Sequence, residues 1–263
     1  MLPIKKAITT VVFVASMITG WMAPEMVLPA NAPSDVPPIV IAEPGEPPAP
    51  EPTEPSRPPV IPGKICYLTF DDGPDGRITP AMLDVLKQYG VKATFFVVGS
   101  KVDAYPKILK RIKDEGHAIA NHTYSHNYAH KQDGAAFAAD LEKANRAIER
   151  VTGERAMIMR VPGGSDSSFR RNVLPQIAKL GYQYYDWNVD SRDALDRKQT
   201  SSQMAERVIR QVAQHKVANV LMHSINTPKS LAALPAIIEG IQNLGYEFRV
   251  IDGSTTPLHF AGN

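Results

Sequence analysis

The sequence has few cysteines and little net charge, and each shortage excludes a class of protein. Its 263 residues include one cysteine, Cys66, so no disulfide can form within the chain and a framework of paired cysteines is excluded. Cys66 lies in an apolar run, where we expect a buried core residue. The formal net charge of +2 indicates neither a nucleic acid nor an acidic polymer as a partner. We find no internal repeat and expect a monomer.

The first 23 residues have the layout of an export signal. Lys5 and Lys6 precede an uncharged, mostly apolar stretch from residue 7 to residue 23. The small residues 30–32 resemble a cleavage site, but Pro33 directly after them hinders cleavage. A signal peptide cleaved near residue 32 and an uncleaved membrane anchor therefore both stay open. In either case we expect an exported protein that is secreted, associated with the cell wall or anchored on the outer side of the cytoplasmic membrane.

Residues 24–62 contain 14 of the 23 prolines of the chain. Proline lacks an N–H group and has a fixed φ, so this stretch can form neither a helix nor a central strand. We expect an extended, semi-rigid spacer that holds a domain away from a membrane. A passive disordered tail is the alternative.

From Gly63 onward, apolar strand-like runs alternate with amphipathic helical ones. This alternation indicates βα units and a parallel sheet or barrel in a domain over residues 63–255, followed by a short tail over 256–263. We expect about seven strands, one fewer than in a standard eight-fold barrel. The predicted strands are 65–70, 92–98, 117–120, 156–159, 183–187, 219–222 and 247–251. The predicted helices are 79–89, 106–115, 133–152, 171–180, 201–213 and 235–244. In the first of them we expect Thr79 as the N-cap, with Pro80 at the first helical position.

Polar residues follow five of the predicted strands, at the point where each strand ends. The carboxyl ends of parallel strands meet at one rim, where sites lie in such folds. This rim should therefore collect carboxylates, imidazoles and a guanidinium. They come from Asp71, Asp72, His122, His126, Arg160, Asp190, Asp193 and His223.

Three of these residues form a candidate metal site. Two adjacent carboxylates after an apolar strand are costly unless a cation neutralises them, and a divalent metal does so. His122 and His126 are four residues apart, which we interpret as one helical turn that lets both imidazoles reach one ion. With Asp72 they give three protein ligands and open positions, as in a catalytic site. His130 continues the spacing, but we expect it on the surface.

The motifs at these strand ends resemble those of carbohydrate-esterase family 4 polysaccharide deacetylases, the NodB homology domain. The likeness covers roughly residues 63–252. It rests on TFDDGP at 69–74, HTYSH at 122–126, RVPGG at 160–164, WNVDSRD at 187–193 and LMH at 221–223. The resemblance implies an irregular (β/α) barrel and metal-dependent hydrolysis of N-acetyl groups on a glycan.

Carried over by motif, the resemblance also implies roles. Asp71 would be the general base, paired with Arg160, while Asp72, His122 and His126 would hold the metal. His223 would be the general acid, oriented by Asp193, although Asp190 competes for that place. The remaining assignments are less direct: the backbone N–H of Gly163, beside Pro162, would hold the oxyanion, and Trp187 or Tyr185 would form a wall that stacks on sugar.

Three residues depart from the family's common pattern. Ala194, Gly163 and Ser224 stand where many members have tryptophan, a larger residue and aspartate, which suggests a more open groove. The export signal and spacer favour peptidoglycan N-acetylglucosamine as the substrate. The alternatives are a chitin or chito-oligosaccharide deacetylase, an acetyl-xylan esterase and a catalytically inactive glycan-binding wall protein. Zn²⁺ is the first choice of metal, and Co²⁺ or Ni²⁺ also suits this ligand set.

Overall fold

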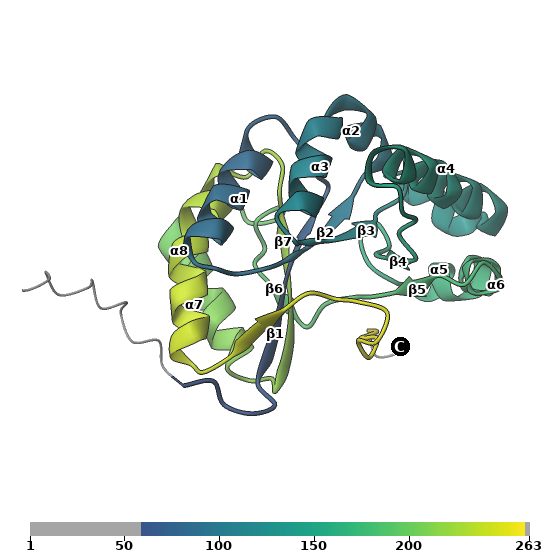
Figure 1. The fold of residues 1–263 in the computed structure, drawn as a ribbon. Coiled ribbons are helices and arrows are strands. Elements are labelled where there is room, and N and C mark those ends of the chain that lie inside the picture. The colour runs from purple at the N-terminus through teal and green to yellow at the C-terminus, as the bar shows by residue number, and fades with distance from the viewer. Residues whose placement is uncertain (1–58, 261–263) are drawn as a thin grey trace, which may run out of the picture. The chain divides into compact units, whose positions relative to one another are not determined.

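The computed structural model describes residues 59–260, so the predicted signal and most of the predicted spacer lie outside the described residues. No helix in this described part is long and apolar enough to cross a membrane. The predicted barrel of parallel strands is confirmed over these residues (Figure 1).

The strands pair in parallel in the order β5-β4-β3-β2-β1-β7-β6, and β8 pairs with the first half of β1. Eight strands are found between residues 59 and 260, because the predicted 183–187 strand ends at Tyr184 and an unpredicted two-residue strand follows at Val189–Asp190. No pairing joins β5 to β6 there, so the barrel is irregular. The strands are β1 (Ile65–Asp71), β2 (Thr94–Val97), β3 (Ala118–Asn121), β4 (Ile158–Met159), β5 (Gln183–Tyr184), β6 (Val189–Asp190), β7 (Val217–His223) and β8 (Glu247–Arg249).

The helices cover the outside of the sheet and differ from the prediction in four places. A short helix, Gly99–Ala104, and a 3₁₀ turn, Tyr128–Gln132, were missed. The predicted 171–180 helix is two helices, and the last helix begins seven residues early, at Pro228 instead of Pro235. Pro228 fills a first-turn position, where its missing N–H is harmless. The helices are α1 (Ile78–Gln88), α2 (Gly99–Ala104), α3 (Pro106–Asp114), the 3₁₀ turn η1 (Tyr128–Gln132), α4 (Gly134–Thr152), α5 (Ser167–Asn172), α6 (Leu174–Lys179), α7 (Ser201–Val212) and α8 (Pro228–Asn243).

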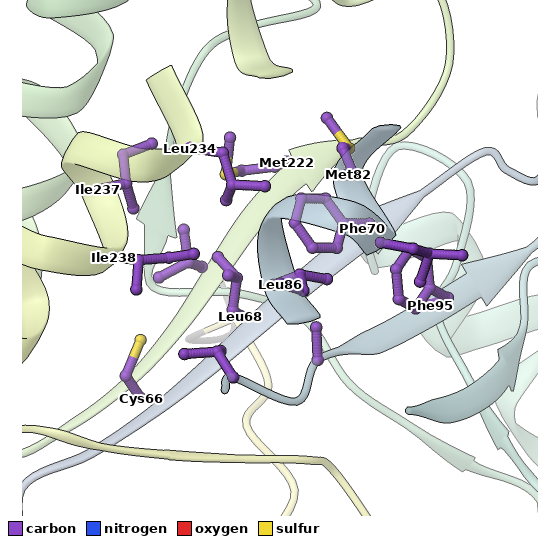
Figure 2. Packing of buried hydrophobic residues seen from close by; sticks show 14 of the residues in the cluster. Cys66, Leu68, Phe70, Met82, Leu86, Phe95, Met222, Leu234, Ile237 and Ile238 are labelled. Carbon is purple, nitrogen blue, oxygen red and sulfur yellow. The ribbon is translucent and has the colours of Figure 1, made fainter. Parts of the chain in front are cut away.

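The central strand β1 divides its side chains between two faces. Cys66, Leu68 and Phe70 are fully buried in the main hydrophobic cluster, with residues of α1 and α8 around them (Figure 2). Side chains alternate along a strand, so Thr69 and Asp71 face the inside of the barrel instead. Burial of Cys66 confirms its prediction as a core residue, and it raises the pKa of the thiol. One strand thus builds the core and the site at once.

The start of α1 is capped differently from the prediction. Thr79 was expected to cap the helix, but the carboxylate of Asp75 accepts the N–H groups of Arg77, Ile78 and Thr79. Thr79 lies inside the helix, and its hydroxyl donates to the carbonyl of Ser224 at 2.9 Å. An aspartate oxygen can satisfy several free N–H groups of a first turn, which explains the change.

The last residues of the described part pack onto the barrel. In Figure 1 the C-terminal segment crosses to the side of β5. Asp186 joins it there: its N–H donates to the carbonyl of Leu258 at 2.8 Å, and its carboxylate accepts the N–H of Phe260 at 2.9 Å. The ring of His259 stacks on Tyr184 with centroids 3.8 Å apart. Residues 256–260 of the predicted tail therefore include residues that pack against the barrel.

Candidate active site

The end of β1 delivers two neighbouring carboxylates in different directions. Asp71 is the last residue of the strand and lies in register with His223 on β7. Asp72 follows with a φ of 71°, so the chain turns away and the two side chains diverge. The turn is tight, because a Cβ on Gly73 would collide with the hydroxyl of Ser224. Ser224 also binds the Asp71 carbonyl through its backbone N–H at 3.0 Å, which fixes the ends of β1 and β7 together.

The three predicted metal ligands meet at this rim. Ligand atoms of Asp72, His122 and His126 all lie within 4.8 Å of one another. The Nε2 atoms of His122 and His126 are 3.4 Å and 3.1 Å from Oδ1 of Asp72. That oxygen is buried and accepts no hydrogen bond, which is costly unless a cation binds it. Burial opposes ionisation of Asp72, but the two imidazoles outweigh it and hold the pKa of this carboxyl well below its usual range.

The orientation of His122 also fits a metal ligand. Its Nδ1 lies 2.8 Å from the carbonyl of Arg160, an acceptor, so Nδ1 carries a hydrogen and Nε2 is the nitrogen that can offer a lone pair to a metal when the ring is neutral. Such a second bond is the usual way in which proteins orient a metal-binding imidazole. The donor set of one carboxylate and two imidazoles suits Zn²⁺ and its neighbours. The residues present therefore fit a divalent metal.

The segment that carries the two imidazoles is not helical. The prediction of one helical turn is wrong, because Thr123 and His126 adopt φ values of 64° and 54°. Asp140 on α4 holds the loop instead: its Oδ2 accepts the N–H groups of Tyr124 and Ser125 at 3.2 Å and 3.0 Å. These bonds replace the missing helical ones and fold the loop so that both imidazoles face Asp72. His130 lies further on, half-buried, with Nδ1 3.8 Å from Oδ2 of Asp140.

Arg160 is fully buried at the centre of the barrel and binds Asp71. Its Nη1 donates to Oδ1 of Asp71 at 2.8 Å and to the hydroxyl of Thr69 at 2.7 Å. Its other N–H groups donate to the carbonyls of Tyr185 and Asp186 and to Oδ1 of Asn219. Five hydrogen bonds use all five donors of the guanidinium, which is what burial of this charge requires.

His223 ends β7 on the other side of the rim. Its Nδ1 lies 2.7 Å from Oδ1 of Asp193, while Asp190, the other candidate, accepts the N–H of Arg192. Oδ2 of Asp193 accepts the backbone N–H of His223 and the hydroxyl of Ser230. Burial alone would lower the pKa of His223, but Asp193 and the more distant carboxylates raise it to about 9. This shift favours the protonated form of His223 at neutral pH, the form that can donate a proton.

Comparisons with known proteins agree with this geometry. A family model described as polysaccharide deacetylase matches residues 60–185. A peptidoglycan-N-acetylglucosamine deacetylase of Bacillus cereus is 33% identical over 202 residues, covering 75% of this chain and 73% of that protein. A peptidoglycan-N-acetylmuramic acid deacetylase of Bacillus subtilis, PdaA, is 34% identical, covering 72% of this chain and 70% of that one. The chain belongs to the polysaccharide deacetylase family.

A solved structure gives the same result. The catalytic domain of a peptidoglycan N-acetylglucosamine deacetylase from Eubacterium rectale superimposes with a TM-score of 0.68 at 39% identity, covering 78% of this chain and 96% of that one. The resemblance to carbohydrate-esterase family 4 is thereby confirmed, and the protein is a hydrolytic deacetylase.

The four residues assigned to the oxyanion or the sugar lie in different surroundings. Gly163 is exposed, with a φ of 71°, and its N–H makes no hydrogen bond within residues 59–260. Pro162 before it is buried. Trp187 is partly exposed, and its ring meets Phe260 edge-on with centroids 4.7 Å apart. Tyr185 is only 1% exposed, so its assignment as a sugar-stacking wall is wrong; it belongs to the core with its hydroxyl bonded to the carbonyl of Thr255.

A recess of about 420 Å³ opens beside His223. Asp72 and Asp193 also line it, and so do Ala194 and Met204. At position 194 only a methyl group borders this space. The space at Gly163 is different, because the ring of Tyr128 occupies it.

Several residues that shape the site were not found from the sequence. Asp140 looks like one polar residue of an amphipathic helix, and Asn219 like a polar interruption of an apolar strand. The partners of these side chains are far away in the sequence, so no local pattern marks them. Tyr128 was missed too, although its place two residues after His126 is a signal that could have been used.

Proposed function

We propose that this deacetylase removes acetyl groups from N-acetylglucosamine units of peptidoglycan with the help of a divalent metal, Zn²⁺ being the first choice. The observation that carries the proposal is that one rim of the barrel holds both a candidate proton acceptor and a candidate proton donor. Asp71, bound to Arg160, is placed to accept a proton, and His223, bound to Asp193, is placed to donate one. Enzymes that need an acid and a base at once divide the work in this way.

The residues of the site account for the proton movements of amide hydrolysis. A metal held by Asp72, His122 and His126 would polarise the acetyl oxygen and acidify a water molecule. As the oxygen of the water bonds to the acetyl carbon, Asp71 takes one proton from that water. The free N–H of Gly163 is available to the oxygen that becomes negative. His223 donates a proton to the sugar nitrogen as the C–N bond breaks, which leaves acetate and a free amine.

The choice of substrate rests on the relatives and on the sequence. Two relatives named above act on peptidoglycan by their names, one on N-acetylglucosamine and one on N-acetylmuramic acid. The export-type segment and the proline-rich spacer would put this domain outside the cell, next to that polymer. We therefore propose an exported enzyme of the cell wall, secreted or tethered to the membrane.

The test is acetate release from purified peptidoglycan and from chitopentaose, before and after treatment with a chelator. We expect release from peptidoglycan, loss of release with the chelator and recovery with added Zn²⁺. Mass spectrometry of the treated glycan should find glucosamine, while de-acetylated muramic acid would contradict the choice of sugar. Faster release from chitopentaose than from peptidoglycan would favour a chito-oligosaccharide deacetylase. Activity unaffected by the chelator would disprove the metal site.

A further inference from the structure

Tyr128 is an exposed aromatic residue beside the metal site. Its side chain is 57% exposed, and it is one of seven large hydrophobic residues with high exposure in the described part of the chain. It begins η1, two residues after His126, and its ring meets that imidazole edge-on with centroids 5.1 Å apart. Burial of its inner edge and the charges of Asp72 and Asp71 raise the pKa of Tyr128. The ring thus lies at the rim, close enough to Asp71 and Asp72 for their charges to act on its hydroxyl.

The backbone beneath the ring is glycine for a steric reason. A Cβ on Gly163 would lie 2.7 Å from Cε1 and 3.3 Å from Cδ1 of Tyr128, closer than side chains tolerate. Gly163 also has a φ of 71°, which favours glycine. The ring therefore rests on the turn whose free N–H faces the reacting group in the proposed mechanism. A side chain at position 163 would therefore require the ring of Tyr128 to move.

A buried lysine holds this corner together. Lys131, at the same η1 turn, is 7% exposed and lies 5.9 Å from the centre of the Tyr128 ring. Its ammonium donates to the carbonyl of Gly164 at 2.8 Å and to Asp166 at 3.3 Å. These contacts tie η1 to the turn that contains Gly163. The ring is held on its inner side, while its hydroxyl has no hydrogen-bond partner within residues 59–260.

We propose that Tyr128 is a stacking platform for a pyranose ring of the glycan, and that Gly163 is small so that this ring can lie there. The proposal rests on the proposed function for the identity of the glycan. Pyranose rings carry a face of C–H groups that packs on an aromatic ring, and polar rims around an apolar face are typical of such sites. The free hydroxyl of Tyr128 can in addition bond to a sugar hydroxyl. Tyr128 would thus have the stacking role that the sequence suggested for Tyr185, which is buried.

The test uses binding as well as turnover. In the Zn²⁺-loaded protein, Tyr128→Ala should raise KM for peptidoglycan and chitopentaose by about three- to tenfold, with kcat within about twofold and metal content unchanged. Tyr128→Phe should stay near the parent, because the ring is kept. Tyr105→Ala is the matched control: Tyr105 is 37% exposed and also lies on a glycine, Gly76, but has no contact with the metal ligands in the described residues.

Binding is measured separately by calorimetry in the Asp71→Asn background, where turnover does not interfere. Chitopentaose should bind about three- to tenfold more weakly when Tyr128→Ala is added. An unchanged Kd and KM would overturn the platform while leaving the deacetylase function intact. A fall in kcat with loss of metal would also overturn it, because Tyr128 would then only support His126. If no acetate is released but Tyr128→Ala weakens binding, the proposed reaction fails and the platform stands.

Gly163→Ala tests the steric part of the proposal. The methyl group keeps the backbone N–H but pushes the ring of Tyr128 from its place. We expect KM to rise as in Tyr128→Ala, and the double variant to show less than the product of the two single effects. Fully multiplicative effects would show that Gly163 and Tyr128 act independently. A melting curve of each variant reports the strain of a side chain at this φ, so that it is not mistaken for lost binding.

Discussion

The two sides of the active site are built in opposite ways. On the base side, Asp71 is 3% exposed and Arg160 is fully buried, with every donor of the guanidinium bonded inside the barrel. On the acid side, His223 and Asp193 form one ion pair that lines an open recess. The first arrangement is part of the core. The second depends on the loop after β6 and on the last residue of β7.

This difference between the two pairs indicates which part of the reaction needs a rigid, buried environment. A buried charge pair is costly to form and very costly to break, so Arg160 and Asp71 serve stability and catalysis together. The pair of His223 and Asp193 sets the protonation of an acid, which needs one charged neighbour and access to the substrate. Changes on the base side should therefore affect folding and rate, and changes on the acid side mainly the pH dependence.

The largest effect is expected for Asp71→Asn. The amide cannot take a proton from water, so kcat on glycan should fall by about 10²–10⁴-fold. Zn²⁺ content should remain, because Asp72 and the two imidazoles are intact. Metal analysis and acetate release on the same sample measure both. A variant with near-normal kcat would remove Asp71 from the role of base.

Arg160→Met should unfold more easily than any variant on the acid side. It leaves Asp71 buried without its partner, and we expect a loss of about 3–5 kcal/mol in the free energy of unfolding, measured with denaturant. The control is Arg160→Met combined with Asp71→Asn, which removes the unpaired charge and should recover part of the loss. Equal losses for the single and double variants would show that the charge of Asp71 is not the cause.

The same contrast explains how much could be predicted from the sequence. Asp71, Asp72, His122 and His223 were found because each stands directly at the end of an apolar strand, where parallel strands deliver side chains to one rim. The environment of Arg160 was predicted only as one pairing, since its contacts to Asn219 and to two carbonyls join distant segments. Local patterns mark where strands end, while long-range packing decides which neighbours a residue meets.

Errors came where a local pattern had two solutions. The spacing of His122 and His126 suits a helical turn, but backbone bonds to Asp140 fold that segment into a loop. Tyr185 lies in the predicted 183–187 strand and was a candidate for the sugar-stacking wall, yet its side chain is buried and its hydroxyl bonds to the carbonyl of Thr255 near the C-terminal end. Both outcomes depend on elements far away in the sequence.

Asp193→Asn should change the pH profile of the acid side. Asp193, with smaller contributions from Asp71 and Asp72, raises the pKa of His223 to about 9, so we expect activity to be lost as the pH rises through that value. Without the charge the pKa falls, and the alkaline limb of kcat should move to lower pH. Rates between pH 6 and pH 10 measure the shift. An unchanged alkaline limb would assign it to another group.

Ser230→Ala is the smallest change and isolates one bond of the acid side. The hydroxyl of Ser230 donates to Oδ2 of Asp193 at 2.7 Å, and its loss leaves the other two bonds of that carboxylate in place. A single hydrogen bond to a charged group contributes about 1.5–3 kcal/mol, and Ser230 is fully buried, so water cannot easily replace the bond. We expect a loss of stability of at most that size and an alkaline limb that moves less than in Asp193→Asn. A shift as large as that of Asp193→Asn would show that Ser230, rather than the carboxylate charge alone, sets the orientation of His223.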